Sequence, residues 1–176
     1  MSDVHDFEPE PDLKEFIQER DEALGFRVAF ILDDTRWKSF KPPNKLSWRK
    51  YKFTENNKKN IPESKGIYAF VFQSNITNLP THGYIMYIGI VTKSERTLNQ
   101  RYGEYLREQK KLKRPKVSTM LAKFAGGLQF FFAVADPQEA DLEQLEIDIA
   151  SAVIPPAVTK DFTPRVRQIV NALAFV

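Results

Sequence analysis

Two β-rich runs, Gly66–Gln73 and Tyr84–Val91, lie close together in the chain and constrain its fold most strongly. Each run is rich in β-branched and aromatic residues, which is typical of a strand. A connection of turn-forming residues, Asn75–Gly83, separates them, and a connection this short favours antiparallel pairing over a parallel crossover. The two runs therefore predict an antiparallel hairpin.

Helices and a further strand are expected after the hairpin, because Thr, Pro and Gly residues divide the remaining sequence. A Thr or Asp before the first helical turn, followed by Pro in two cases, is a favourable helix start. The predicted elements are helices at Leu98–Leu112 (capped by Thr97) and Val117–Phe124, a strand at Leu128–Ala135, and helices from Asp136-Pro137 to Ile154 and from Thr163-Pro164 to Leu173.

The first 60 residues predict a helix that begins near Pro11 and ends at Gly25, a strand at Phe26–Leu32, and a short extended piece near Ser47–Phe53. The predicted fold class is thus α+β, with a small, mainly antiparallel central sheet of about three strands flanked by helices and an N-terminal helix/strand extension. The expected division is an extension over residues 1–60, a main domain over 61–160 and a C-terminal helix over 161–176.

Composition excludes several kinds of site. The chain has 176 residues, no cysteine and two histidines, His5 and His82. Disulfides, thiolate zinc sites and a cysteine nucleophile are therefore excluded, and a multi-histidine metal site is not expected. Because no apolar run reaches the length of a membrane span and no leader is evident, we expect no membrane association and a cytoplasmic location.

Charge is unevenly distributed: residues 1–24 carry a net charge of −7, and the rest of the chain carries +10. Two basic clusters stand out, at Arg36–Lys59, where aromatic residues are interleaved, and at Arg107–Lys116. Cations beside aromatic rings suit a phosphate backbone with stacked bases. A charge run alone is more often a solvated face. The candidate nucleic-acid-binding residues are Lys45, Arg49, Lys50, Lys52, Lys93, Lys110, Lys111, Lys113 and Arg114.

Two tripeptides, Gly66-Ile67-Tyr68 and Tyr87-Ile88-Gly89, occupy the two hairpin strands, and the chain from about Pro62 to Val158 resembles the GIY-YIG nuclease family. Arg101 lies in the following helix, where the family carries an arginine, and Tyr105 lies four residues later on the same face. Glu146 lies in a late helix nine residues before Pro155, the carboxylate-to-proline spacing of the family.

The resemblance implies a DNA endonuclease that uses one Mg²⁺ or Mn²⁺ per site. It implies that Glu146 holds the metal, that Arg101 holds the scissile phosphate, and that Tyr68 or Tyr87 positions or deprotonates the water, with Tyr68 slightly favoured. Tyr105 would hydrogen-bond the phosphate or the water. Glu143, one turn away, is the alternative metal ligand. The partners expected are duplex or branched DNA and, as an option, a second copy of the chain.

Two family positions differ here and keep alternatives open. Ile90 stands where a lysine often follows the second tripeptide, so Lys93 or the metal would have to favour tyrosine ionisation. Val158 or Thr159 stands where the family has an asparagine. A catalytically degenerate nucleic-acid-binding protein and a protein-interaction module, docking through the acidic head or the aromatic segment, are the competing hypotheses.

Overall fold

The computed structural model describes residues 10–42, 45–73, 76, 78–92, 96–138 and 141–173. Within these ranges the elements follow one another as α1 (Pro11–Leu24), α2 (Asp34–Ser39), β1 (Arg49–Lys52), the 3₁₀ helix η1 (Glu55–Asn60), β2 (Gly66–Phe72), β3 (Tyr84–Val91), α3 (Leu98–Glu108), α4 (Pro115–Lys123), β4 (Leu128–Val134), α5 (Leu142–Val153) and α6 (Pro164–Leu173).

The sheet is antiparallel throughout and has the strand order β1-β4-β2-β3. The α+β class and the β2–β3 hairpin are confirmed, and in the hairpin Tyr68 pairs with Gly89. The sheet has four strands rather than about three, because β1 joins its edge. β1 lies within the predicted extended piece Ser47–Phe53 and pairs with β4, where Tyr51 lies opposite Phe130. The N-terminal segment therefore contributes to the same sheet as the hairpin.

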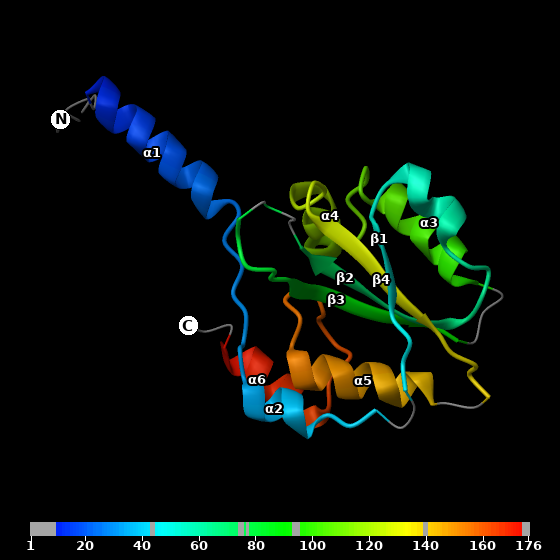
Figure 1. Ribbon diagram of the computed structural model, residues 1–176. Coiled ribbons are helices and arrows are strands. Elements are labelled where there is room, and N and C mark those ends of the chain that lie inside the picture. The colour runs from blue at the N-terminus through cyan, green and yellow to red at the C-terminus, as the bar shows by residue number, and fades with distance from the viewer. Residues whose placement is uncertain are drawn as a thin grey trace.

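Alternating side chains give the sheet two buried faces, because successive residues of a strand point to opposite sides. On one face Tyr68, Phe70 and Phe130 pack against α3 and α4. On the other face Ile67, Ala69 and Ile88 pack against α5. Figure 1 shows α3 and α4 on one side of the sheet and α5 on the other, with α2 and α6 beside α5. The motif tyrosine Tyr68 therefore faces α3.

Several predicted elements have other bounds in the structure; the helix predicted at Val117–Phe124, for example, is α4, which Pro115 begins. The segment Phe26–Leu32 is not a strand: Val28, Phe30 and Ile31 pack against the core by their side chains, but the segment joins no sheet in the described part of the chain. The helix from Thr97 ends at Glu108, before Leu112. The late helix begins at Leu142 instead of Pro137, because Asp141 caps it by accepting a hydrogen bond from Gln144 N at 3.0 Å.

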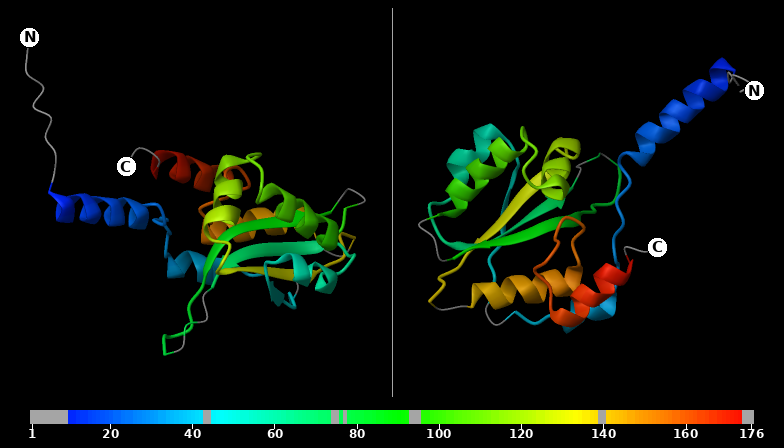
Figure 2. Two further views of the ribbon diagram at one scale, coloured as in Figure 1. Left: turned by 90° about the horizontal axis from the view of Figure 1, so that it is seen from above. Right: turned by 180° about the vertical axis from the view of Figure 1, so that it is seen from behind.

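Helix α1 projects away from the body of the molecule in all three views (Figures 1 and 2), and none of its residues is buried. After α5, the chain passes along β3, where Ala157 N donates a hydrogen bond to Met86 O at 3.0 Å, and then returns to α6. None of the described helices combines the length and the apolar character that crossing a membrane requires.

Candidate active site

The glycine of the second tripeptide makes room for the tyrosine of the first. A Cβ atom placed on Gly89 would lie 2.5 Å from Tyr68 Cζ and would overlap the Tyr68 hydroxyl. Gly66 has φ of +154°, and a Cβ there would overlap the carbonyl of Ala133 on β4. Both positions therefore require glycine for steric reasons. The pairing register of the hairpin, which sets Gly89 opposite Tyr68, therefore gives the Tyr68 ring its place.

Tyr68, Tyr105 and Arg101 form one hydrogen-bonded group between β2 and α3. The two phenolic oxygens are 2.9 Å apart. Arg101 donates from Nε to the Tyr68 hydroxyl at 3.1 Å and from a terminal nitrogen to the Tyr105 hydroxyl at 3.3 Å. Both tyrosines are fully buried, while Arg101 is partly exposed. One guanidinium thus contacts both phenols and also faces solvent.

The start of α3 fixes where Arg101 and Tyr105 lie. Thr97 and Gln100 form a reciprocal capping box, and Leu98 N donates to Ser64 O at 2.8 Å, which ties the helix to the segment before β2. Tyr102, on the inner face of α3, donates from its hydroxyl to Thr54 O at 2.7 Å. Arg101 and Tyr105 are four residues apart on α3 and therefore lie on one side of it, facing β2.

Tyr87 joins the group through ring packing and brings a second arginine with it. Its ring centroid lies 6.5 Å from that of Tyr68 and 6.1 Å from that of Tyr105. The Arg114 guanidinium lies 5.2 Å from the Tyr105 ring centroid and 6.0 Å from that of Tyr87. Glu108, which is buried, holds Arg114 through two hydrogen bonds of 2.9 and 2.5 Å. Three tyrosines and two arginines therefore share one site.

Glu146 lies on α5 and is half-buried, and among the described residues it makes no hydrogen bond or ion pair. Burial, followed by the negative charges of Asp161 and Glu143, raises the pKa of Glu146 to about 7, while Arg101 and Lys160 lower it. The positive charge of Arg101, on α3, therefore favours the ionised form of Glu146, although Glu146 lies on α5 at the other face of the sheet. Glu143, the alternative ligand, is exposed on the same helix.

The environment of the tyrosines opposes their ionisation. Burial, and then the neighbouring Tyr87, raise the pKa of Tyr68 to about 12, although Arg101 lowers it. Burial raises the pKa of Tyr87 and of Tyr105 further. Of the three phenols, Tyr68 has its pKa raised least, because the Arg101 charge and the hydrogen bonds from Arg101 and Tyr105 lower it.

A basic cavity of about 500 Å³ opens above this group. Arg101 and Arg114 line it, while the three tyrosines and Glu146 do not. Two acids neutralise part of its charge: Glu104 bonds Arg101 at 2.6 Å and Arg96 at 3.1 Å, and Glu108 pairs with Arg114. The lining residues are Arg96, Arg101, Glu104, Arg107, Glu108, Lys111, Lys113 and Arg114. The two arginines thus separate the phenols from the cavity.

The predicted nucleic-acid-binding residues are divided between different surfaces. Lys111, Lys113 and Arg114 line the basic cavity, whereas Lys110 lies 3.9 Å from Glu55. On β1, successive side chains alternate in direction, so Arg49 lies on the face opposite to Lys50 and Lys52. Lys45 is exposed near β1, and Lys93 lies outside the described residues.

The predictions from sequence do not include Glu104 and Glu108, the two acids that line the cavity, and they do not place Arg114 beside the tyrosines. Glu104 had a signal, because it lies three residues after Arg101 with opposite charge on the same helix. Arg114 was identified only as part of a basic run. Its packing on Tyr87 and Tyr105 depends on how the connection after α3 folds back, which no local pattern specifies.

The two positions that depart from the family pattern are apolar in the structure as well. Ile90 is half-buried and packs with the residues facing α5, and Val158 is 3% exposed in the main core. Thr159 is exposed. Among the described residues, Arg101 and Arg114 are the cations that lie over the Tyr87 and Tyr105 rings.

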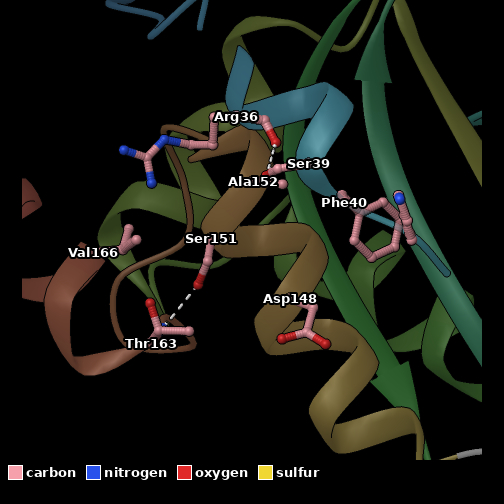
Figure 3. A pocket seen from close by; sticks show the side chains of 9 residues that line it. Arg36, Ser39, Phe40, Asp148, Ser151, Ala152, Thr163 and Val166 are labelled. Carbon is pink, nitrogen blue, oxygen red and sulfur yellow. Dashed lines mark hydrogen bonds between the residues drawn. The ribbon is translucent and has the colours of Figure 1, made fainter. Parts of the chain in front are cut away.

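A second cavity, of about 370 Å³, lies between α2, α5 and α6. Figure 3 shows Ser151 hydrogen-bonded to Thr163 there, and Asp148 pointing outward from α5. Arg36 reaches this cavity from α2, and its Nε lies 3.5 Å from Asp33. None of the tyrosines of the candidate site lines it.

Comparison of the chain with protein families, with curated proteins and with solved structures found no match.

Proposed function

We propose that this chain is a metal-dependent endonuclease of the GIY-YIG type that hydrolyses DNA phosphodiester bonds, acting in the cytoplasm. One observation carries the proposal: Arg101 hydrogen-bonds the phenols of Tyr68 and Tyr105, and Tyr87 packs beside them. These four residues are separated in sequence, and the resemblance to the GIY-YIG family singles them out in the sequence. Their convergence beneath a basic cavity supports a site for an anionic substrate.

The residues around Glu146 fit a single divalent cation. Glu146 is half-buried without a partner among the described residues, and Asp161 and Glu143 add negative charge near it. Mg²⁺ often binds through one carboxylate, with water and substrate phosphate completing its coordination, so the lack of a cluster of three ligand side chains in the described chain is compatible with it. When bound, Mg²⁺ or Mn²⁺ would stabilise the charge that develops on the leaving oxygen.

The chain's own residues supply the remaining functions. Arg101 stays protonated and presents a planar fork that suits a phosphate, and Tyr105 holds the guanidinium in place. In this proposal Tyr68 orients the attacking water and accepts its proton, which requires Arg101 to turn from the buried Tyr68 hydroxyl toward the substrate phosphate. With its pKa near 12, ionised Tyr68 costs about 7 kcal/mol at neutral pH, so the reaction should accelerate with rising pH. Arg114 adds positive charge beside Tyr87.

A nucleic-acid-binding protein without catalysis is the second candidate. The observation that favours it is the Glu104 carboxylate, which bonds both Arg101 and Arg96 and thus competes with a phosphate for them. In that case the cations at the cavity rim would bind the DNA backbone, and the buried phenols would serve the core.

Nicking of supercoiled plasmid, with branched and single-stranded substrates alongside, separates the two functions. We expect cleavage with Mg²⁺ or Mn²⁺ and none with EDTA. Glu146→Gln and Arg101→Lys should each lower the rate by about 10²–10³-fold, because each removes an interaction with charge that forms in the transition state. Circular dichroism checks that both variants fold. Glu19→Gln on the exposed α1 is the matched control.

The result also decides the role of each group. DNA binding without cleavage by the unaltered protein would favour the second candidate, and full activity of either variant would refute the assignment of that residue. Mg²⁺ should raise the unfolding temperature of the unaltered protein more than that of Glu146→Gln, which tests metal binding without measuring activity.

A further inference from the structure

We propose that α1 of one copy of this chain docks into the groove beside α4 of a second copy, and that the exchange is reciprocal. The groove has a volume of about 390 Å³ and runs along α4. Val28, Met120 and Phe124 are among its apolar lining residues, and Pro115 and Gly25 also line it. An open apolar groove of this kind fits the apolar side of an amphipathic helix.

Helix α1 has the length and the side chains that the groove requires. Leu13, Phe16 and Leu24 are exposed by 44, 61 and 52%, so α1 leaves its apolar residues in water. At 1.5 Å per residue, Leu13 and Leu24 are about 16 Å apart, and the nine residues of α4 span about 13 Å. The apolar residues of α1 therefore extend along the whole of the groove.

Charge complementarity identifies the occupant. Helix α1 itself has five acidic and two basic residues and thus a net charge of −3, while the chain after residue 24 carries +10, so α1 is attracted to the body of this same chain. Arg27, Lys116 and Lys123 line the apolar groove. Lys111 and Lys113 line the basic cavity, which adjoins the start of α4. Helix α1 is acidic and has exposed apolar residues, so it is complementary to this surface both in charge and in apolar character.

The junction after α1 favours docking between copies over docking within one copy. Phe26 N and Arg27 N donate to Ala23 O and Leu24 O, both at 3.0 Å, and so continue the helix into the linker. Lys123 donates to Gly25 O, and the Phe26 ring packs edge-on against Phe124 at 6.1 Å. Folding α1 back onto its own groove would break these contacts. A helix from a second copy leaves them intact, and reciprocal docking gives a closed two-fold dimer.

Light scattering coupled to size-exclusion chromatography tests the proposal. The unaltered protein should have twice the monomer mass at high concentration and should dissociate as salt is added. Phe16→Asp on α1 and Thr119→Glu in the groove, both at exposed positions, should each raise the dissociation constant at least about tenfold. Leu79→Asp, at an exposed apolar residue in the connection between β2 and β3 and outside both surfaces, should leave the mass unchanged.

Mixing the two variants distinguishes exchange from other modes of association. Phe16→Asp retains an intact groove and Thr119→Glu retains an intact helix, so one of the two interfaces can form between them. The mixture should therefore contain more dimer than either variant alone. A monomer at every concentration, a dimer unaffected by both substitutions, or no dimer gained on mixing would each overturn the proposal.

Discussion

At the scale of single residues, Glu146 is a carboxylate that α5 holds half-buried without a partner among the described residues. Its pKa of about 7 lies above the unfolded value near 4.5, so the folded protein binds this proton more tightly than the unfolded chain. The stability that the protonated form contributes is fully present below pH 4.5 and is lost as the pH rises through 7.

Glu146→Gln should therefore stabilise the protein above pH 7 and have little effect near pH 4.5. The expected difference is about 1–3 kcal/mol in the free energy of unfolding, since one pKa unit corresponds to about 1.4 kcal/mol and partial exposure reduces the full value. Urea unfolding of both proteins at several pH values measures it, with Glu19→Gln as control. An equal difference at pH 5 and pH 8 would contradict the assigned burial.

The residue types of the site could be predicted from sequence, while their protonation and partners could not. The resemblance to the GIY-YIG family singles out Tyr68, Tyr87, Arg101 and Tyr105, and the helical repeat places Arg101 and Tyr105 on one face, because motif order and helix periodicity are local properties of the chain. Glu104 neutralises Arg101, and Arg114 packs on two tyrosines. Both contacts depend on how α3 and the connection between α3 and α4 are arranged in the folded protein.

At the scale of elements, the hairpin of β2 and β3 sets the geometry of the site through the Tyr68–Gly89 pair. Gly89→Ala places a methyl group against the Tyr68 ring, whose hydroxyl is already bonded to Tyr105 and Arg101. We expect a loss of about 1–3 kcal/mol in the free energy of unfolding, because overpacking a buried contact forces displacements. Chemical denaturation measures this loss directly.

Gly126→Ala is the matched control, because a Cβ at Gly126 would meet no atom within 4 Å. Its unfolding free energy should differ from that of the unaltered protein by less than about 1 kcal/mol. Equal stability of the two glycine variants would show that Tyr68 is not held against Gly89. If the proposed function holds, Gly89→Ala should also lower the rate of DNA nicking, since the phenol is displaced.

The elements with strong local signals were predicted well. Thr97, followed by an apolar periodicity, predicted the start of α3, and Thr163-Pro164 predicted the start of α6, because capping and a fixed proline φ act within one turn. Segment Phe26–Leu32 has strand-like residues but makes only side-chain contacts, and strand pairing depends on an available partner edge. Asp136-Pro137 forms a turn, where Gln138 N donates to Asp136, and α5 begins later.

At the scale of the whole molecule, the structure separates the two basic clusters that the sequence presents as similar. The cations of β1 alternate between the two faces of an edge strand, and Lys50 is engaged with Gln73 and the Phe131 ring. Four of the six cations of the second cluster, Arg107, Lys111, Lys113 and Arg114, line one cavity over the candidate site. If DNA binds at this site, the second cluster should therefore contribute more of the electrostatic affinity than β1.

The dependence of DNA affinity on salt tests this distribution. If about six phosphates are neutralised, a plot of log affinity against log salt concentration should have a slope near roughly −5, as each contact releases condensed counterions. Substituting Lys111 and Lys113 by Gln should make the slope shallower by about two, measured by fluorescence anisotropy with a labelled duplex. Substituting Arg49 and Lys50 by Gln is the matched control and should change it less, because these side chains point to opposite faces. A slope near zero for the unaltered protein, or a larger effect of the β1 pair, would show that the basic cavity is not the surface that binds the phosphates.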